Sequence, residues 1–131
     1  MNLEDIIAVS GLPGLFKMAA SRSNGLIIEG LEGGKKRFVS IRKHQFTPLE
    51  SVSIYTITDT KPLVDIFKSM KEKIEELPLP SGSDSSEILT KYFREILPDY
   101  DEDKVLVSDI RKVVKWYVAL DNIKMISTEE E

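Results

Sequence analysis

The sequence predicts an α+β protein, with a small antiparallel β-barrel-like N-terminal module followed by an all-α helical part. Up to Thr58, short segments alternate apolar and polar side chains with a period of two, as strands do. After Thr58, apolar residues recur every three to four positions, as on one face of a helix. We therefore divide the chain into residues 1–58 and 59–131, the latter with a linker at 78–86 and an acidic tail at 127–131.

The N-terminal module is expected to begin with a short helix capped by Asn2, which ends in the turn "SGLPG" at residues 10–14. Alternation from Leu15 predicts a first strand, and Asn24-Gly25 predicts a tight hairpin turn with left-handed backbone angles. Further strands are expected at residues 25–29, 37–41 and 51–57, with one helical turn at 47–50 capped by Thr47. Four short strands at this spacing favour a strongly bent sheet or barrel.

Three helices are expected after Thr58, capped by Thr60, by Asp84 together with Glu87, and by Ser108. Their apolar stripes are Leu63, Ile66, Phe67, Met70, Ile74 and Leu77; Ile88, Leu89, Tyr92, Phe93, Ile96 and Leu97; and Ile110, Val113, Val114, Tyr117 and Leu120. "PLPSGSDSS" at residues 78–86 has the composition of a linker.

Composition sets limits on the chemistry. The 131 residues include no cysteine, which excludes disulfides, thiolate nucleophiles and cysteine-bound zinc. No stretch approaches the roughly 18 apolar residues of a membrane span, and the first residues are acidic where a signal peptide needs positive charge. We therefore expect a cytoplasmic protein without a membrane partner. The net charge of −4 argues against a protein that coats nucleic acid, yet residues 1–60 carry seven Lys/Arg against six Asp/Glu.

The glycine-rich turns do not fit a phosphate loop. Gly34-Lys35 is the only Gly-Lys pair, and the P-loop pattern fails there because Glu29 stands in place of the first glycine. A dinucleotide-binding G-x-G-x-x-G is absent. We interpret the glycines as turn residues and expect no cofactor.

The acidic stretch "DYDEDKVLVSDI" at residues 99–110 places Asp99, Asp101 and Asp103 at positions one, three and five of an EF-hand loop. Position six is Lys104 instead of glycine, and position twelve is Ile110 instead of the bidentate glutamate. A solvated acidic turn between two helices is therefore favoured over a calcium site, and we expect no metal.

Catalysis has little support, because His44 is the only histidine and no G-x-S-x-G nucleophile motif accompanies it. We expect a protein that is not an enzyme and that has no catalytic residues. The favoured function is a binding or adaptor module for a protein partner, with Trp116 and Tyr117 as contact residues since such aromatics dominate interface hot spots.

The alternative is RNA or DNA binding through a basic hairpin surface, with Phe46 or Tyr55 available to stack a base. A structure decides between these functions by showing whether the basic side chains converge on one face. The candidate residues are Lys35, Lys36, Arg37, Arg42 and Lys43.

Several segments resemble a family of small bacteroidete proteins that share a domain of unknown function. They are "VSGLPGLFK" at 9–17, "NGLIIEGL" at 24–31, "PLESVSIYT" at 48–56 and "LPDYDEDKVLVSDIRKVVKWY" at 97–117, together with the acidic tail. The resemblance covers nearly the whole chain, and it implies a small barrel of the Src-homology-3-like kind followed by a separate helical part. It implies no catalytic or binding residue.

Overall fold

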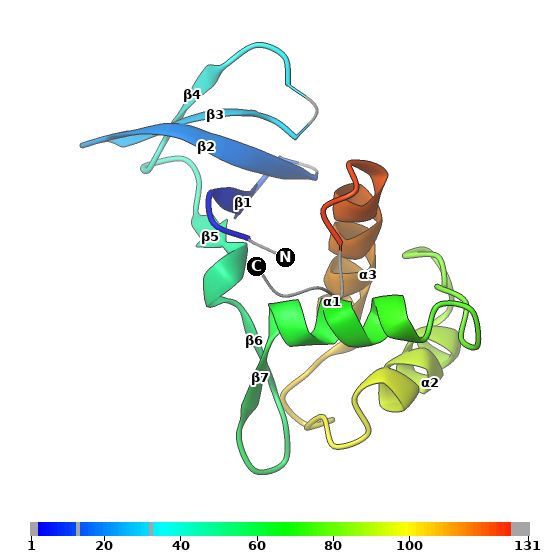
Figure 1. Cartoon of the computed structure of the whole chain (residues 1–131). Coiled ribbons are helices and arrows are strands. Elements are labelled where there is room, and N and C mark those ends of the chain that lie inside the picture. Colours follow the sequence, from blue (N-terminus) through cyan, green and yellow to red (C-terminus); the bar gives the residue numbers. More distant parts are fainter. Residues whose placement is uncertain (1–2, 13, 32, 127–131) are drawn as a thin grey trace. The chain divides into compact units, whose positions relative to one another are not determined.

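The computed structural model describes residues 3–12, 14–31 and 33–126, and the chain divides into two compact units (Figure 1). The N-terminal unit spans Asn2–Val52, and the C-terminal unit contains Ser53–Glu131. The division lies six residues before the boundary predicted after Thr58. The reason is the strand expected at 51–57, which does not join the sheet of the N-terminal unit.

The N-terminal unit is one five-stranded antiparallel sheet of β1 (Ile6–Val9), β2 (Leu15–Arg22), β3 (Gly25–Gly30), β4 (Arg37–Ser40) and β5 (Phe46–Pro48). The strand order is β4-β3-β2-β1-β5. Within the described ranges no pairing joins β4 to β5, so the expected barrel is an open sheet. The α+β class is confirmed, because this sheet is followed by three helices.

The core of this unit collects apolar side chains from β1, β3 and β4. Ile7, Val9, Ile28 and Val39 are buried there, and Leu12, Phe16, Leu26 and Phe46 pack against them while partly buried. A bulge between Met18 and Ala20 inserts Ala19 into β2, so the alternation along β2 changes at that residue.

Two predictions for the start of the chain are corrected. Residues Ile6–Val9 form β1 instead of a helix, and β1 pairs with both β2 and β5. Three of its four residues are β-branched, and the burial of Ile6, Ile7 and Val9 in a central strand stabilises the extended backbone. Asn2, the expected cap, and Pro13 of the turn lie outside the described residues.

The glycines of the first turn behave as expected, since Gly11 and Gly14 have φ of 81° and 82°. Gly25 differs from the expectation. It is not among the residues with positive φ, and it opens β3 opposite Arg22, which leaves Ser23 and Asn24 as the hairpin loop. A side chain at Gly25 would overlap the carbonyl oxygen of Val39 and lie 2.8 Å from the ring of Phe38. The glycine is therefore needed for the close approach of β4 and not for the turn.

The helical turn expected at 47–50 is a single 3-10 turn, η1 (Leu49–Ser51), in which Leu49 is fully buried. Thr47 is not its cap. The turn begins after Pro48, and no side chain caps it.

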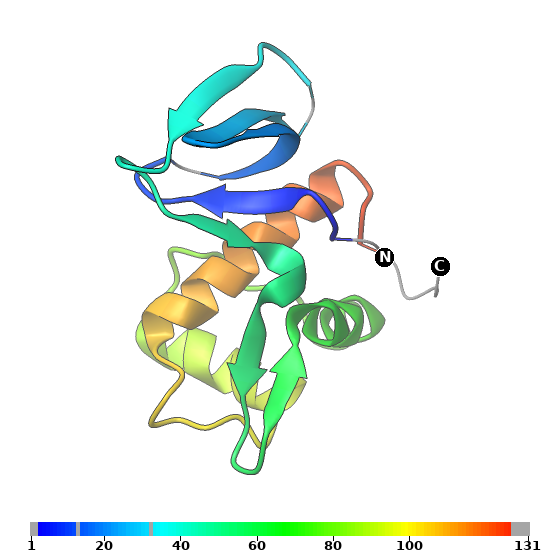
Figure 2. The same ribbon diagram turned by 90° about the vertical axis from the view of Figure 1, so that its left-hand side faces the viewer.

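The C-terminal unit begins with a two-stranded hairpin, β6 (Ser53–Tyr55) and β7 (Thr60–Pro62), followed by α1 (Leu63–Glu72), α2 (Ser86–Ile96) and α3 (Val107–Asn122) (Figure 2). Thr60 is a strand residue opposite Tyr55, and Pro62 holds the N-cap position of α1. The prediction that Thr60 caps this helix was therefore wrong.

The other two helix caps also differ from the prediction. Ser85 caps α2, since its side chain accepts a hydrogen bond from the Ile88 N–H at 3.3 Å. The Asp84 carboxylate instead accepts from the Ser81 N–H at 2.7 Å. At α3 the N-cap residue is Leu106, not Ser108, and Asp109 Oδ2 accepts from the Leu106 N–H at 3.0 Å.

The apolar stripes of the three helices form the core of the C-terminal unit, as predicted. Every member of the α3 stripe is buried, while Ile88 on α2 is half-exposed and Ile74 and Leu77 lie beyond the end of α1. The rings of Phe67 and Tyr117 meet edge to face with centroids 6.0 Å apart, and those of Phe93 and Tyr100 do so at 5.0 Å.

The segment expected to be a linker is tied to α3. The Arg111 guanidinium donates hydrogen bonds to the carbonyl oxygens of Gly82 and Asp84 at 2.9 and 2.8 Å. The chain passes so close to α3 that a Cβ at Gly82 would lie 2.7 Å from the Lys115 side chain. This segment therefore belongs to the C-terminal unit. None of the helices in the described parts of the chain has the length and apolarity needed to cross a membrane.

Replacement of Gly25 by alanine should destabilise the N-terminal unit by about 1–3 kcal/mol, because the new methyl group overlaps the backbone of β4. Urea titration of the full chain, followed by amide signals of β3 and β4 in NMR spectra, measures the effect. Ser23→Ala in the adjacent loop is the control and should change little. Equal stability of Gly25→Ala and the control would contradict the packing described for Gly25.

Three buried tyrosines should make the C-terminal unit sensitive to alkali. Burial raises the pKa of Tyr92, Tyr100 and Tyr117 above the usual value near 10, with smaller contributions from Tyr117, Glu102 and Asp121, respectively. In the unfolded chain these phenols ionise near pH 10, whereas in the folded chain they keep their protons. The contribution of these three tyrosines to stability is therefore constant below about pH 10, and it falls above that pH by up to about 1.4 kcal/mol per pH unit for each tyrosine.

Urea midpoints from helical circular dichroism at pH 8, 10 and 11 test this prediction. Tyr117→Phe keeps the ring contact with Phe67 and should reduce the loss of stability between pH 10 and 11. Tyr55→Phe alters a half-exposed ring and serves as the control. If both variants lose stability at the same rate as the parent protein, burial of Tyr117 does not cause the pH dependence.

Candidate functional site

The five basic residues predicted as a binding site lie at the two ends of β4, and all five are exposed. Lys35, Lys36 and Arg37 lead into the strand or begin it, while Arg42 and Lys43 follow its end at Ser40. A four-residue strand is roughly 10 Å long, so the structure places the charges in two groups that flank β4 instead of bringing them together in one cluster. The sequence between Gly33 and Leu49 contains no acidic residue.

Two apolar side chains lie exposed between the charged groups. Phe38 is 45% exposed and Ile41 is 62% exposed, although Val39 between them is buried in the core. The Phe38 ring lies over the space that a Gly25 side chain would fill, so the sheet supports one side of the ring. We call the side chains Lys35, Lys36, Arg37, Phe38, Ile41, Arg42 and Lys43 the β4 surface.

Among the described residues β4 is an edge strand, paired with β3 along one side only (Figure 1). The Ile41 N–H donates to the Asn24 carbonyl at 3.0 Å, which fixes the alternation of the ladder. Because hydrogen-bonded pairs occur at every second residue, Val39 directs its backbone groups toward β3. Phe38 directs its N–H and carbonyl toward the open edge, and Ser40 directs its N–H there, while the Ser40 carbonyl is bonded within the following turn. β4 therefore offers the backbone groups of Phe38 and the Ser40 N–H beside its exposed apolar and basic side chains.

The turn after β4 is held in place by hydrogen bonds at both ends. The Ser40 carbonyl accepts from the Lys43 and His44 N–H groups, and Ser40 Oγ accepts from the Arg42 N–H. At the other end Ser10 and Gln45 bond through their backbones, and Ser10 Oγ accepts from the Gln45 N–H at 2.7 Å. Arg42 and Lys43 are thus presented from an ordered backbone.

His44 contributes to this anchoring. Its Nδ1 lies 2.7 Å from the Ser10 carbonyl oxygen, which makes Nδ1 the protonated nitrogen of the neutral ring. The side chain is half-buried and connects the turn to the end of β1. In this position the histidine has a structural partner, and the described geometry assigns it no reacting group.

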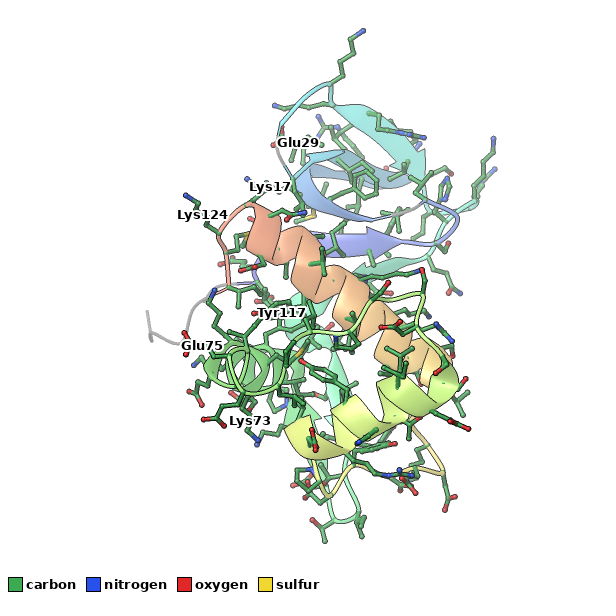
Figure 3. All side chains as sticks on the ribbon, turned by 90° about the vertical axis from the view of Figure 1, so that its right-hand side faces the viewer. Lys17, Glu29, Lys73, Glu75, Tyr117 and Lys124 are labelled. Carbon is green, nitrogen blue, oxygen red and sulfur yellow. The ribbon has the colours of Figure 1, made fainter. Side chains whose placement is uncertain are left out.

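The two predicted aromatic contact residues are not brought together on the surface. Tyr117 is fully buried and packs on Phe67, so it is not accessible to a partner in this structure (Figure 3). Burial raises its pKa, with a smaller contribution from Asp121. Trp116 is half-buried on α3. We therefore assign neither residue to the candidate site.

The acidic stretch at 99–110 joins α2 to α3, and two of its carboxylates accept hydrogen bonds from nearby backbone N–H groups. Asp101 Oδ1 accepts from the Asp103 N–H at 3.0 Å, and Asp109 caps α3. Among the described residues no group of three or more His, Asp or Glu side chains has the arrangement of a metal site.

The sequence pattern named the basic residues as candidates, but it did not single out Phe38, Ile41 or an open edge. A strand at 37–41 was predicted, and in any strand Phe38 and Val39 point to opposite faces. What was missing was the position of this strand at the end of the sheet, which depends on pairings between strands distant in sequence.

Comparison with known proteins identifies the two parts of the chain separately. A family model described as the domain of unknown function DUF5606 matches residues 3–49, and one described as DUF6852 matches residues 52–120. The chain belongs to the DUF6852 family. The two matched ranges meet close to the Val52–Ser53 division of the compact units.

A solved relative supports the architecture of this DUF6852 family member. The solution NMR structure of a protein from Bacteroides vulgatus is similar with a TM-score of 0.74 and 30% sequence identity, covering 92% of this chain and 87% of that one. The resemblance to a bacteroidete family of unknown function is thereby confirmed. No curated protein matches the sequence.

Ser40→Ala should loosen the turn that presents Arg42 and Lys43, because it removes the acceptor for the Arg42 N–H while β4 keeps its backbone pairing. Hydrogen exchange at the Arg42 amide should become faster by several-fold, consistent with the loss of about 1 kcal/mol from one hydrogen bond. Ser53→Ala on the exposed face of β6 is the control. Unchanged exchange at Arg42 would show that the side chain of Ser40 does not hold the turn.

Proposed function

We propose that this protein is a non-enzymatic binding module whose β4 edge takes up an extended, acidic segment of a partner protein. The observation that carries the proposal is the open edge of β4, where the backbone N–H and carbonyl of Phe38 and the N–H of Ser40 face outward between two groups of exposed cations. A peptide added as a further strand gains main-chain hydrogen bonds, and side chains beside the edge select its sequence.

The charge of the β4 surface defines the kind of segment. The segment from Gly33 to Leu49 contains five Lys and Arg side chains and no Asp or Glu, which favours Asp and Glu in the partner. Phe38 and Ile41 add apolar contacts, so alternating acidic and apolar residues complement this edge best.

Nucleic acid is the alternative partner, favoured by exposed Phe38 beside the same cations. A base can stack on an aromatic ring, and phosphates pair with Lys and Arg. Two features favour a peptide. The cations form two separated groups instead of a continuous basic track, and the outward backbone groups of an edge strand match a peptide backbone.

Titration of the ¹⁵N-labelled full chain with a synthetic octapeptide of alternating glutamate and valine tests the proposal. The amides of Phe38 and Ser40 should shift, and Phe38→Ala should weaken binding about threefold to tenfold through the lost apolar contact. Arg37→Gln with Arg42→Gln should weaken it further and reduce its salt dependence. Lys91→Gln with Lys124→Gln removes two exposed charges elsewhere and is the matched control.

Two further probes separate the alternatives. Two N-methylated forms of the octapeptide are compared, one methylated at its valine amides and one at its glutamate amides. Only one of the two should lose binding, because only one set of peptide amides faces β4. Absence of shifts with the unmodified octapeptide overturns the proposal. A ten-nucleotide thymidine strand that shifts Phe38 more strongly than the peptide does would instead establish nucleic-acid binding.

A further inference from the structure

A second surface with apolar and charged character lies on the β6–β7 hairpin of the C-terminal unit. Tyr55 is 50% exposed and Ile57 is 74% exposed, while Thr56 between them is buried. Tyr55 ends β6, and Ile57 lies two residues later in the bend at the hairpin tip. Ile57 is the most exposed large apolar side chain in the described parts of the protein.

The loop between α2 and α3 lies beside the hairpin and is hydrogen-bonded to it (Figure 2). The Ile57 N–H donates to the Asp99 carbonyl and the Asp101 N–H donates to the Tyr55 carbonyl, both at 2.9 Å. Within the loop at the hairpin tip, the Thr56 N–H donates to the Asp59 carbonyl and Thr56 Oγ1 accepts from the Asp59 N–H. The exposure of Tyr55 and Ile57 is thus a property of an ordered backbone.

The hairpin and the loop segment bonded to it are rich in acidic residues. The hairpin segment 53–60 and the loop segment 98–103 contain five acidic residues and no Lys or Arg. Two of these acids are engaged, since Glu102 pairs with Arg94 at 2.6 Å and Asp101 accepts from the Asp103 N–H. Asp59, Asp99 and Asp103 are exposed. We call Tyr55, Ile57, Asp59, Asp99 and Asp103 the hairpin surface.

One cation already occupies part of the hairpin surface. Lys104 Nζ lies 4.9 Å from the centroid of the Tyr55 ring, within the range of a cation–π contact. Lys104 is exposed and belongs to the same chain. Its position indicates that this face of the Tyr55 ring can contact a cation.

We propose that the hairpin surface binds an arginine-rich segment of a partner protein, with an arginine of that segment displacing Lys104 from the Tyr55 ring. A guanidinium stacks on an aromatic ring more effectively than an ammonium does and pairs with carboxylates through two hydrogen bonds, so arginine competes with Lys104. Asp59, Asp99 and Asp103 attract the remaining cations, and Ile57 contacts the aliphatic stems of the bound side chains.

This surface is opposite in charge to the β4 surface and lies on the other compact unit. It selects a different class of segment from the one proposed for β4. The inference rests on separate residues and stands whether or not β4 binds an acidic peptide.

Fluorescence anisotropy of a labelled octapeptide of alternating arginine and serine, titrated with the full chain, tests the inference. Lys104→Ala should increase affinity about twofold to fivefold, because the competing cation is removed. Tyr55→Leu leaves the charge of the protein unchanged and should decrease affinity by a similar factor. Asp99→Asn with Asp103→Asn should decrease it further.

Matched controls separate the contact from long-range attraction. Lys91→Ala removes one exposed positive charge from α2, and Glu75→Gln with Glu76→Gln removes two exposed carboxylates. Lys91→Ala should change the peptide affinity less than Lys104→Ala does. The double glutamate variant should change it less than Asp99→Asn with Asp103→Asn does. Circular dichroism of every variant confirms that the helices are retained.

Three results would overturn the inference. They are an unchanged affinity of Tyr55→Leu, equal effects of Lys104→Ala and Lys91→Ala, and equal binding of a glutamate–serine octapeptide. Sedimentation of the protein alone supplies a fourth test. Self-association abolished by Arg37→Gln with Arg42→Gln would identify a second copy of this chain, instead of an arginine-rich partner, as the occupant.

Discussion

The edge of the N-terminal unit depends on the missing side chain of Gly25. β4 approaches β3 so closely at this point that any Cβ would overlap the Val39 carbonyl, and the Phe38 ring lies over the same space. On this face the Phe38 ring is supported from one side, while Val39 points to the opposite face and is buried in the core with Ile7, Val9 and Ile28. The exposure of Phe38 is therefore a consequence of how β3 and β4 pack, and it leaves an apolar group beside the open edge.

The C-terminal unit is stabilised by helix packing and by a loop that supports its short hairpin. Its three helices bury their apolar stripes against one another, and the short β6–β7 hairpin is too small to be stable alone. The loop between α2 and α3 supplies the missing support through backbone bonds to Tyr55 and Ile57, while Tyr100 packs on Phe93. The acidic residues of this loop are thereby placed beside the hairpin.

The two proposed surfaces carry opposite local charges, which the net charge of the whole chain does not reveal. The value of −4 for the whole chain conceals a segment at 33–49 without acids and a segment at 98–103 in which four of six residues are acidic. Complementary potentials mainly determine which partner is selected and how fast it associates. At both proposed surfaces, exposed apolar side chains beside the charges would add contacts to a partner that salt does not screen.

The sequence alone determined the class of fold, because a change from alternating to helical periodicity reports local backbone geometry directly. It also determined the buried faces of all three helices and the group of basic residues around β4. The start of the chain was misread, because a short apolar run fits a helix or a buried strand equally well and only its pairing with β2 and β5 decides. Only the tertiary structure decided that Tyr117 is inaccessible, that β6 pairs with β7, and that β4 is an edge. Each of these properties depends on contacts between residues far apart in sequence, which no local pattern encodes.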